Sequence, residues 1–157
     1  MQYVSDLRHC NNFTLAQNTI INVSRGPTGI NNENTGSYTV QNNLWYSNWG
    51  GGFNRGSAGT YVQDHNSFLR HGSCPTGTAN ICDTSAPNPF VNWQGGNFNL
   101  ASENNDWNNR VALGDPYTID LNGTVRTTDR GAYEYISGAP PPSDTTPPSA
   151  PSGVSVQ

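Results

Sequence analysis

One pattern recurs in the stretches Leu15-Ala-Gln-Asn18-Thr-Ile20, Val40-Gln-Asn-Asn43-Leu-Trp45 and Gln63-Asp-His-Asn66-Ser-Phe68: an asparagine stands two residues before a large apolar residue. The three asparagines are 25 and then 23 residues apart. A pattern that repeats every ~20 to 50 residues is typical of proteins built from stacked copies of one unit. The three stretches therefore predict a repeat architecture.

Each unit reads as a strand, an asparagine turn, a second strand and a long loop. A single unit of this kind cannot bury its apolar face, so it has to stack on copies of itself. Stacking places Asn18, Asn43 and Asn66 above one another at about 4.8 Å, the spacing of adjacent strands. Their amides can then hydrogen-bond along the stack. The apolar positions predict two interior stacks, Tyr38 with Tyr61, and Ile20 with Trp45 and Phe68.

The third unit departs from the pattern, because Gln63 stands where the first two units have Leu15 and Val40. A bulge in which Val62 takes the inner place would restore the apolar interior. We therefore expect an irregular strand here. The pattern leaves open which way the next two side chains, those of Asp64 and His65, face.

The composition favours short strands and many turns. The 157 residues are 32% hydrophobic and only 11% charged, about half the usual ~25%. Disorder is not expected, because aromatic residues make up 10% of the chain and include four Trp. No window shows the apolar spacing of a long helix. We expect an all-β protein.

Charge and hydropathy exclude several partners. The chain has no lysine and a net charge of −4, so it lacks the clustered cations that nucleic acids require. No apolar run approaches the roughly 18 residues that span a bilayer. No secretion signal follows Met1, which leaves a cytosolic protein or an internal piece of a secreted one.

The cysteines favour the secreted alternative. Cys74 and Cys82 bracket a short loop containing Pro75 and Gly77, which would let the two ends meet in a disulfide. The alternative is two unpaired buried thiols. Cys10 is left over, and we expect any partner in sequence before Met1. A single Cys pair without a matching His pair does not predict a zinc site.

The coils resemble those of right-handed parallel β-helix proteins, the architecture of pectate lyases and many secreted bacterial proteins. Four downstream motifs follow in order: Asn88-Pro-Phe-Val-Asn92, Gly96-Asn-Phe-Asn-Leu100, Thr118-Ile-Asp-Leu-Asn-Gly-Thr-Val-Arg126 and Asp129-Arg-Gly-Ala-Tyr-Glu-Tyr135. This order is similar to the C-terminal region of choice-of-anchor Q domain proteins. Three positions depart from that family's pattern: Asn88 replaces Asp, residues 101–107 replace a Ser-Pro-Ala-Ile-Asp segment, and Arg130 replaces Ile.

The resemblance implies that residues 1–136 are the C-terminal coils and irregular cap of a right-handed parallel β-helix. An open end of such a stack exposes apolar interior and strand edges. We expect aromatic and apolar residues to cover it, namely Phe90, Trp93, Phe98, Leu100 and Trp107. Asp120, Arg126 and Glu134 are expected to hold the final turns by hydrogen bonds. Residues 137–157 read as a Pro-rich linker whose last residues resemble the start of a fibronectin type III domain.

The densest group of titratable residues consists of Asp64, His65, Arg70 and His71. In β-helix polysaccharide lyases a basic side chain abstracts a proton beside a neutralised uronate. The resemblance therefore makes His65, Arg70 and His71 candidate catalytic residues, since imidazole titrates near neutral pH and Arg pairs with carboxylates. The alternative is that all three are solvated turn residues.

Aromatic residues near Gly50-Gly-Gly52 are candidates for binding sugar rings. Trp45 is expected in the core, so Tyr46 and Trp49 are the predicted carbohydrate-binding residues. Glu103 and Asp106 are a weaker candidate pair for glycoside hydrolysis, which needs two carboxylates roughly 5 to 9.5 Å apart.

No metal or cofactor is predicted. The carboxylates of Asp115, Asp120 and Asp129 are of the type that binds calcium, but their spacing matches no compact calcium-binding loop. Turn roles are expected instead. Three Asn-x-Ser/Thr matches, at Asn12, Asn22 and Asn122, are expected by chance in so Asn-rich a chain.

The resemblance implies a secreted or cell-surface β-helix protein that binds or processes extracellular polysaccharide, with this part acting mainly as scaffold and cap. If the whole protein is an enzyme, a polysaccharide lyase or glycoside hydrolase is expected, with its chemistry on coils before Met1. The alternative is a structural or adhesive surface or filament protein without a site.

Overall fold

The computed structural model describes residues 12–22, 36–47, 60–72 and 74–138. This part is all-β, as the composition predicts, with one short 3-10 helix. The elements are, in order, β1 (Asn12–Ala16), β2 (Thr19–Ile21), β3 (Ser37–Gln41), β4 (Leu44–Tyr46), β5 (Thr60–Asp64), β6 (Ser67–Leu69), β7 (Ile81–Asp83), β8 (Phe90–Asn92), η1 (Trp93–Gly95) and β9 (Asn97–Leu100).

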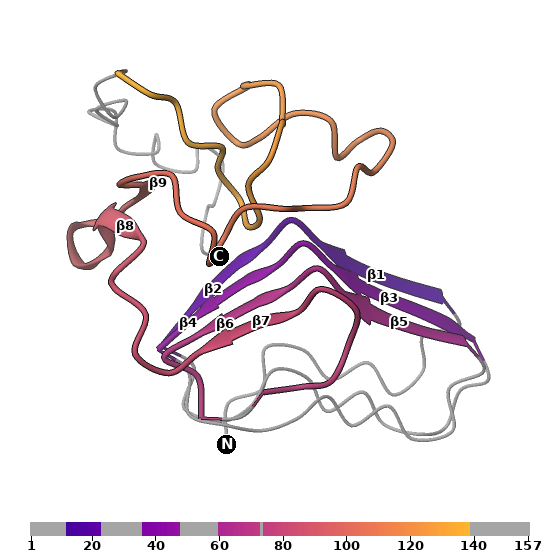
Figure 1. The fold of residues 1–157 in the computed structure, drawn as a ribbon. Coiled ribbons are helices and arrows are strands. Elements are labelled where there is room, and N and C mark those ends of the chain that lie inside the picture. Colours follow the sequence, from indigo (N-terminus) through magenta and orange to yellow (C-terminus); the bar gives the residue numbers. More distant parts are fainter. Residues whose placement is uncertain (1–11, 23–35, 48–59, 73, 139–157) are drawn as a thin grey trace, which may run out of the picture.

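The strands form three sheets. β1, β3 and β5 make one parallel sheet, β2, β4, β6 and β7 make a second, and β8 pairs antiparallel with β9. The two parallel sheets meet along a bend, like the two slopes of a roof (Figure 1). Each slope therefore receives one strand from each of the first three units.

The units stack in register despite their unequal spacing. Tyr38 lies opposite Phe13 on one side and Tyr61 on the other, and Trp45 lies between Ile20 and Phe68. The rings of Trp45 and Phe68 are stacked, with centroids 6.2 Å apart. Equivalent residues of successive units are thus neighbours, so the predicted stacking is confirmed for the described strands.

An asparagine ladder runs along the bend. The Asn18 side-chain amide donates to Asn43 Oδ1 at 3.2 Å, and that of Asn43 donates to Asn66 Oδ1 at 2.9 Å. Each side-chain oxygen also accepts the backbone N–H of the preceding asparagine at 3.0 Å. The predicted ladder is confirmed, and it continues to a fourth member, Asn80, whose Oδ1 accepts the Asn66 N–H at 2.9 Å.

Every ladder asparagine follows a residue with left-handed backbone. These residues are Gln17, Asn42, His65 and Ala79, with φ between 51° and 60°. Such a conformation is unfavourable for residues other than glycine, so the surrounding structure has to enforce it. The ladder does this by tying each bend to the next, as when Asn66 donates to Val40 O at 2.8 Å.

The fourth unit is shortened and closes the end of the stack. Asn80 follows Asn66 by only 14 residues, and the predicted Cys74–Cys82 disulfide is present. Cys82 lies opposite Phe68 in the sheet register. A Cβ on Gly77 would lie 1.8 Å from Gln63 O, which shows how closely this loop packs under the third unit. The disulfide loop therefore covers the end that we expected the downstream aromatic residues to cover.

The expected bulge at Gln63 is wrong. β5 pairs with β3 without a register shift, so Gln63 lies opposite Val40 and Val62 lies opposite Thr39. Gln63 is buried, and its Oε1 accepts the Tyr61 hydroxyl at 2.7 Å. This hydrogen bond satisfies the amide oxygen, whereas Nε2 has no hydrogen-bond partner among the described residues.

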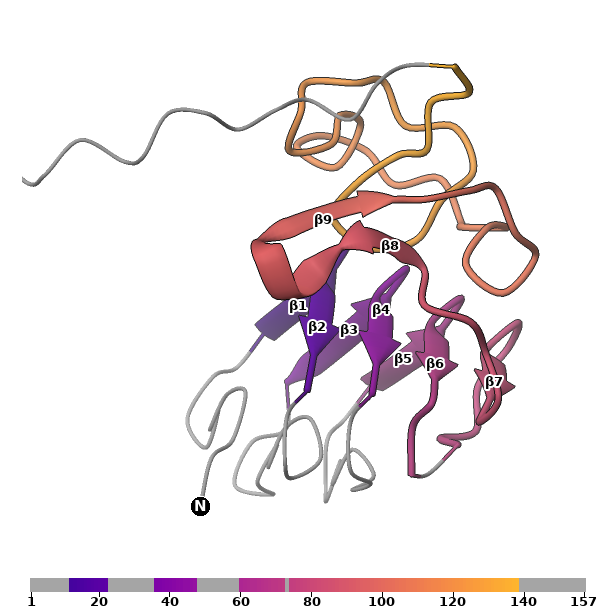
Figure 2. The same ribbon diagram turned by 90° about the vertical axis from the view of Figure 1, so that its left-hand side faces the viewer.

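Two apolar clusters lie on opposite faces of the second parallel sheet. One consists of Ile20, Trp45 and Phe68 with Leu15 against it. The other joins the sheet to the closing segment, residues 84–138, which lies on the outside of the bend (Figures 1 and 2). Its buried members are Leu44, Tyr46, Leu69, Ala86, Phe90, Leu100 and Trp107, with Trp93 and Phe98 packed against them. The predicted aromatic cover thus lies on the flank of the stack.

Gly131 sets how closely the closing segment approaches the sheet. Its φ is +91°, and a Cβ there would lie 2.7 Å from Thr19 Oγ1 and 2.9 Å from Leu44 Cβ. We expect Gly131→Ala to lower the free energy of unfolding by about 2 to 3 kcal/mol, through backbone strain and this overlap. Urea denaturation measures the loss. Gly114→Ala is the control, because a Cβ there meets nothing within 4 Å. Equal effects of the two substitutions would contradict the close approach.

Candidate functional site

The best candidate for a functional group is a carboxylate and imidazole pair at the bend between β5 and β6. His65 Nδ1 lies 3.3 Å from Asp64 Oδ1, and each side chain is 22% exposed. Gln41 Nε2 donates to the same carboxylate oxygen at 2.5 Å. The His65 backbone N–H donates to Thr78 O at 2.9 Å. The bend thus fixes the backbone of His65 and the carboxylate of Asp64.

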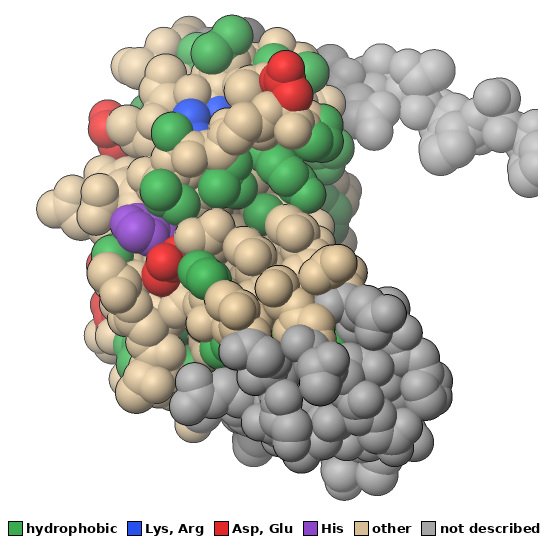
Figure 3. All heavy atoms as spheres, turned by 90° about the vertical axis from the view of Figure 1, so that its right-hand side faces the viewer, with side chains coloured by type: hydrophobic (Ala, Val, Ile, Leu, Met, Phe, Trp, Pro, Cys, Tyr) green, Lys and Arg blue, Asp and Glu red, His purple; other side chains and the backbone are tan. Residues whose placement is uncertain are grey.

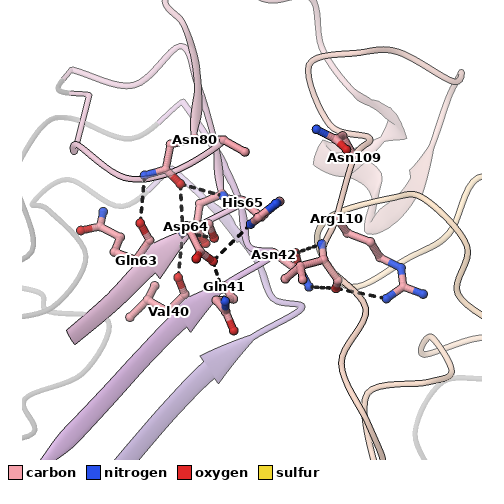
Figure 4. Close-up of polar contacts among 12 residues, drawn as sticks. Val40, Gln41, Asn42, Gln63, Asp64, His65, Asn80, Asn109 and Arg110 are labelled. Carbon is pink, nitrogen blue, oxygen red and sulfur yellow. Dashed lines mark hydrogen bonds and ion pairs between the residues drawn. The ribbon is translucent and has the colours of Figure 1, made fainter. Parts of the chain in front are cut away.

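Asp64 lies at ion-pair distance from the imidazole but forms no hydrogen bond with it, and His65 Nδ1 has no hydrogen-bond partner among the described residues. Across from His65, the closing segment places Asn109 and Arg110 (Figure 4). Arg110 is half-buried and donates from Nη2 to Arg126 O at 2.6 Å. The guanidinium of Arg110 is directed to backbone carbonyls, those of Val111 and Arg126, and away from the imidazole (Figure 4).

The other two predicted catalytic residues do not join this pair. Arg70 and His71 follow the far end of β6. Arg70 donates from Nε to Ala86 O at 2.7 Å and lies over the Tyr46 ring at 5.8 Å, on the closing-segment side. His71 is 4% exposed and packs edge-on against Phe68 at 5.3 Å, on the opposite side. The structure therefore does not bring Arg70 together with either histidine: His65 precedes β6, and the side chains of Arg70 and His71 lie on opposite sides of the sheet.

Of the two predicted sugar-binding residues, the structure describes only Tyr46. Tyr46 is 3% exposed and packs edge-on against Phe90 and Trp93, with ring centroids 5.7 Å and 6.5 Å away. A ring enclosed in this way has no free face for a sugar, so this expectation is wrong. The closing segment supplies the enclosing rings. Trp49 lies outside the described residues.

The carboxylate whose charge affects the pKa of Asp106 is that of Asp83, and not that of the predicted partner Glu103. Partial burial raises the pKa of Asp106, and the charge of Asp83 raises it further. The Ser85 hydroxyl and N–H, each 2.7 Å from Asp83 Oδ1, lower the pKa of Asp83. The sequence did not indicate this pair, because stacking of the closing segment on β7 brings the two residues together.

The remaining acidic candidates hold turns, as expected. Asp115 Oδ1 accepts the Thr118 hydroxyl at 2.6 Å. Asp120 accepts three backbone N–H groups, those of Asn122, Thr124 and Glu134, at 2.7 to 2.9 Å. These contacts occupy the Asp120 oxygens with donors.

Arg126 and Glu134 also act as predicted. Arg126 donates to Ile119 O, Gly131 O and Ala132 O at 2.9 to 3.1 Å. Glu134 Oε1 accepts the backbone N–H groups of Thr127 and Thr128 at 2.8 and 2.7 Å. Together with Asp120 they fix the last turns of the closing segment.

Sequence reasoning missed the residue that joins the closing segment to the stack. Arg130, a departure from the family pattern, is fully buried. Its guanidinium donates to Asn66 O and Ala79 O at 2.9 Å each, to Asn109 O at 3.0 Å and to Ser67 Oγ at 3.3 Å. Burial lowers the pKa of Arg130 to about 10, so it stays charged at neutral pH. It connects the third unit, the fourth unit and the closing segment.

Comparisons of this chain with protein-family models, with curated proteins and with solved structures found no match. The resemblance to choice-of-anchor Q proteins therefore rests on the quoted motifs and stays a prediction. Within the described ranges, no helix has the length and apolar character needed to cross a membrane.

Proposed function

We propose that this chain is part of a secreted right-handed parallel β-helix that binds extracellular polysaccharide, and that the described part acts mainly as its scaffold and cap. The observation that carries the proposal is the register of the three stacked units. Register repeats the same side-chain positions about every 4.8 Å, which gives an extended surface suited to an extended polymer. The exposed Cys74–Cys82 disulfide supports an extracellular location, where such bonds persist.

The surface that fits this role is the outer face of β1, β3 and β5. The residues that occupy the same positions as those alternating with the buried Tyr38 and Val40 are exposed or half-buried apart from the buried Ala16, and most are polar. They form three rows across the strands: Asn12, Ser37 and Thr60; Thr14, Thr39 and Val62; Ala16, Gln41 and Asp64. Figure 3 looks onto this side and shows a mainly polar surface below the closing segment. Hydroxyl and amide groups in rows can hydrogen-bond to successive sugars.

A glycan array followed by titration tests this proposal. We expect saturable binding to at least one polysaccharide, weakened at least tenfold by Thr39→Glu, because a charge in the middle row displaces the polymer. Thr84→Glu is the control, since Thr84 is exposed on the turn after β7 and outside this face. Absence of saturable binding, or equal loss in both variants, would favour the alternative below.

We expect no turnover of uronans or neutral glycans by this chain. His65 lies apart from Arg70 and His71, so the three basic residues predicted from the sequence are not brought together to neutralise a uronate and abstract its proton. Product release monitored by ultraviolet absorbance and by reducing ends checks this. Turnover that is abolished by His65→Ala would overturn the scaffold role.

The second candidate is a structural or adhesive protein. The observation that favours it is the asparagine ladder, which links four successive units by side-chain hydrogen bonds and stiffens the stack without needing a ligand. This candidate predicts no saturable glycan binding and no effect of Thr39→Glu in the array.

A further inference from the structure

One carboxyl group in the closing segment is buried with half of its hydrogen-bonding capacity unused. Asp129 is 1% exposed. Its Oδ2 accepts the Tyr135 N–H at 2.7 Å, whereas Oδ1 has no hydrogen-bond partner among the described residues. An ionised carboxylate in this setting lacks the donors that would offset its desolvation. The geometry favours a protonated Asp129.

Most of the charged groups around Asp129 are carboxylates, which also favour its protonated form. Glu134 is buried in the same turn, and its Oε2 accepts the Asp129 N–H at 3.3 Å. Asp120 is joined to this turn through the Glu134 N–H, and the exposed Glu103 adds a further negative charge. Arg126 is the opposing cation, but its guanidinium donates to backbone carbonyls. Three buried carboxyl groups thus share one guanidinium.

Burial raises the pKa of Asp129 to about 7. The Tyr135 N–H opposes this shift, Glu134 and Glu103 add to it, and Arg126 opposes it. The unfolded pKa is 3.8, so the folded protein binds this proton more tightly than the unfolded chain does. The resulting stabilisation is complete below about pH 4 and is lost as the pH rises to about 7.

Asp129 directly precedes the residues that hold the closing segment to the stack. Arg130 reaches Asn66 O, the Gly131 N–H donates to Asn42 O at 2.7 Å, and the Ala132 N–H donates to Thr19 Oγ1 at 2.9 Å. An unfavourable negative charge on Asp129 therefore destabilises the turn from which all three contacts are made. Movement of this turn would loosen them together.

We infer that the turn of residues 127–135 is a pH-sensitive lock, which holds the closing segment against the stack while Asp129 carries a proton and loosens when that proton is lost. Acid conditions strengthen the attachment through this group, and mildly alkaline conditions weaken it.

Urea denaturation of the whole chain at pH 5.5, 7 and 8, followed by tryptophan fluorescence, tests the lock. We expect the unfolding constant to rise roughly ten- to thirtyfold from pH 5.5 to 8, since each pH unit below the folded pKa changes it up to about tenfold. Asp129→Asn imitates the protonated group, so the ten- to thirtyfold rise of the unfolding constant should be lost in this variant. Asp115→Asn, at an exposed turn, should keep the wild-type response.

A flat wild-type response, or a pH response that persists in Asp129→Asn, would overturn the inference. If Asp129→Asn fails to fold, carboxyl-carbon NMR of the wild-type chain decides the question. A titration midpoint near pH 7 for Asp129 supports the lock, and a midpoint below pH 5 overturns it. Glu103→Gln should move that midpoint to lower pH, because it removes a neighbouring negative charge.

Discussion

Replacing Arg130 by Met is expected to lower the free energy of unfolding by about 3 to 5 kcal/mol, because buried carbonyls that accept from its guanidinium are left without that donor. In this 157-residue chain, that loss lowers Tm by roughly 6 to 20 °C. Met has similar length and apolar character, so the substitution removes the hydrogen bonds while largely retaining side-chain volume. The loss should appear in the attachment of the closing segment first.

The size of this effect follows from the backbone carbonyls that lose a hydrogen-bond donor when the guanidinium is removed. Asn66 O retains a second donor, the Ile81 N–H at 2.8 Å. Ala79 O and Asn109 O lose the guanidinium donor that reaches each of them. A buried polar group left without a partner costs about 1 to 3 kcal/mol. Since these two carbonyls belong to the fourth unit and the closing segment, both sides of the contact are weakened.

Thermal denaturation measured by circular dichroism and tryptophan fluorescence checks this result. Arg110→Met is the matched control, because Arg110 is only half-buried and its short hydrogen bond to Arg126 O lies within the closing segment. We expect a loss of about 1 kcal/mol for the control. If Arg130→Met melts within 2 °C of the parent chain, roughly the measurement scatter, Arg130 does not hold the two parts together.

Asn43→Asp, in the middle of the ladder, should have an effect of comparable size. Asn43 is fully buried, and its amide group donates to Leu15 O at 2.8 Å and to Asn66 Oδ1 at 2.9 Å. Asp changes one atom, but it places an oxygen against both acceptors and adds a buried charge. We expect a loss of roughly 3 kcal/mol or more at pH 7, because a charged oxygen is buried against both acceptors, of which Asn66 Oδ1 keeps another donor, the Asn43 N–H.

Asn97→Asp makes the same chemical change where only an acceptor is needed. Asn97 Oδ1 accepts the Asn99 N–H at 3.1 Å and the Asn99 side-chain amide at 2.9 Å. This control should be neutral within about 0.5 kcal/mol. Urea titrations at pH 7 and pH 4 compare the two variants, and Asn43→Asp should recover part of its loss at pH 4, where a protonated Asp can donate once. Equal stabilities of the two variants at pH 7 would contradict the role of the ladder.

Some details of the bend could have been found by aligning the repeats more fully. Gln41 stands two residues before Asn43, and Asp64 stands two residues before Asn66, so both occupy one register position. That alignment predicts the Gln41–Asp64 hydrogen bond. Asn80 does not stand out in the sequence, because it follows Asn66 by only 14 residues and so does not match the spacing of the other ladder asparagines.

The repeat, the ladder, the parallel strands and the disulfide were determined by the sequence itself, because each depends on side-chain chemistry recurring at regular intervals along the chain. An amide group both donates and accepts hydrogen bonds, so the same amide at the equivalent position of the next unit can be its partner. The tertiary structure alone decided that the aromatic residues cover the flank, that the side chains of Arg70 and His71 lie on opposite sides of the sheet, and that Arg130 joins the closing segment to the stack. Arg130 binds mainly backbone carbonyls, 64 and 51 residues away in the case of Asn66 and Ala79. Every residue carries such a carbonyl, so no sequence pattern identifies the one that a buried guanidinium will reach.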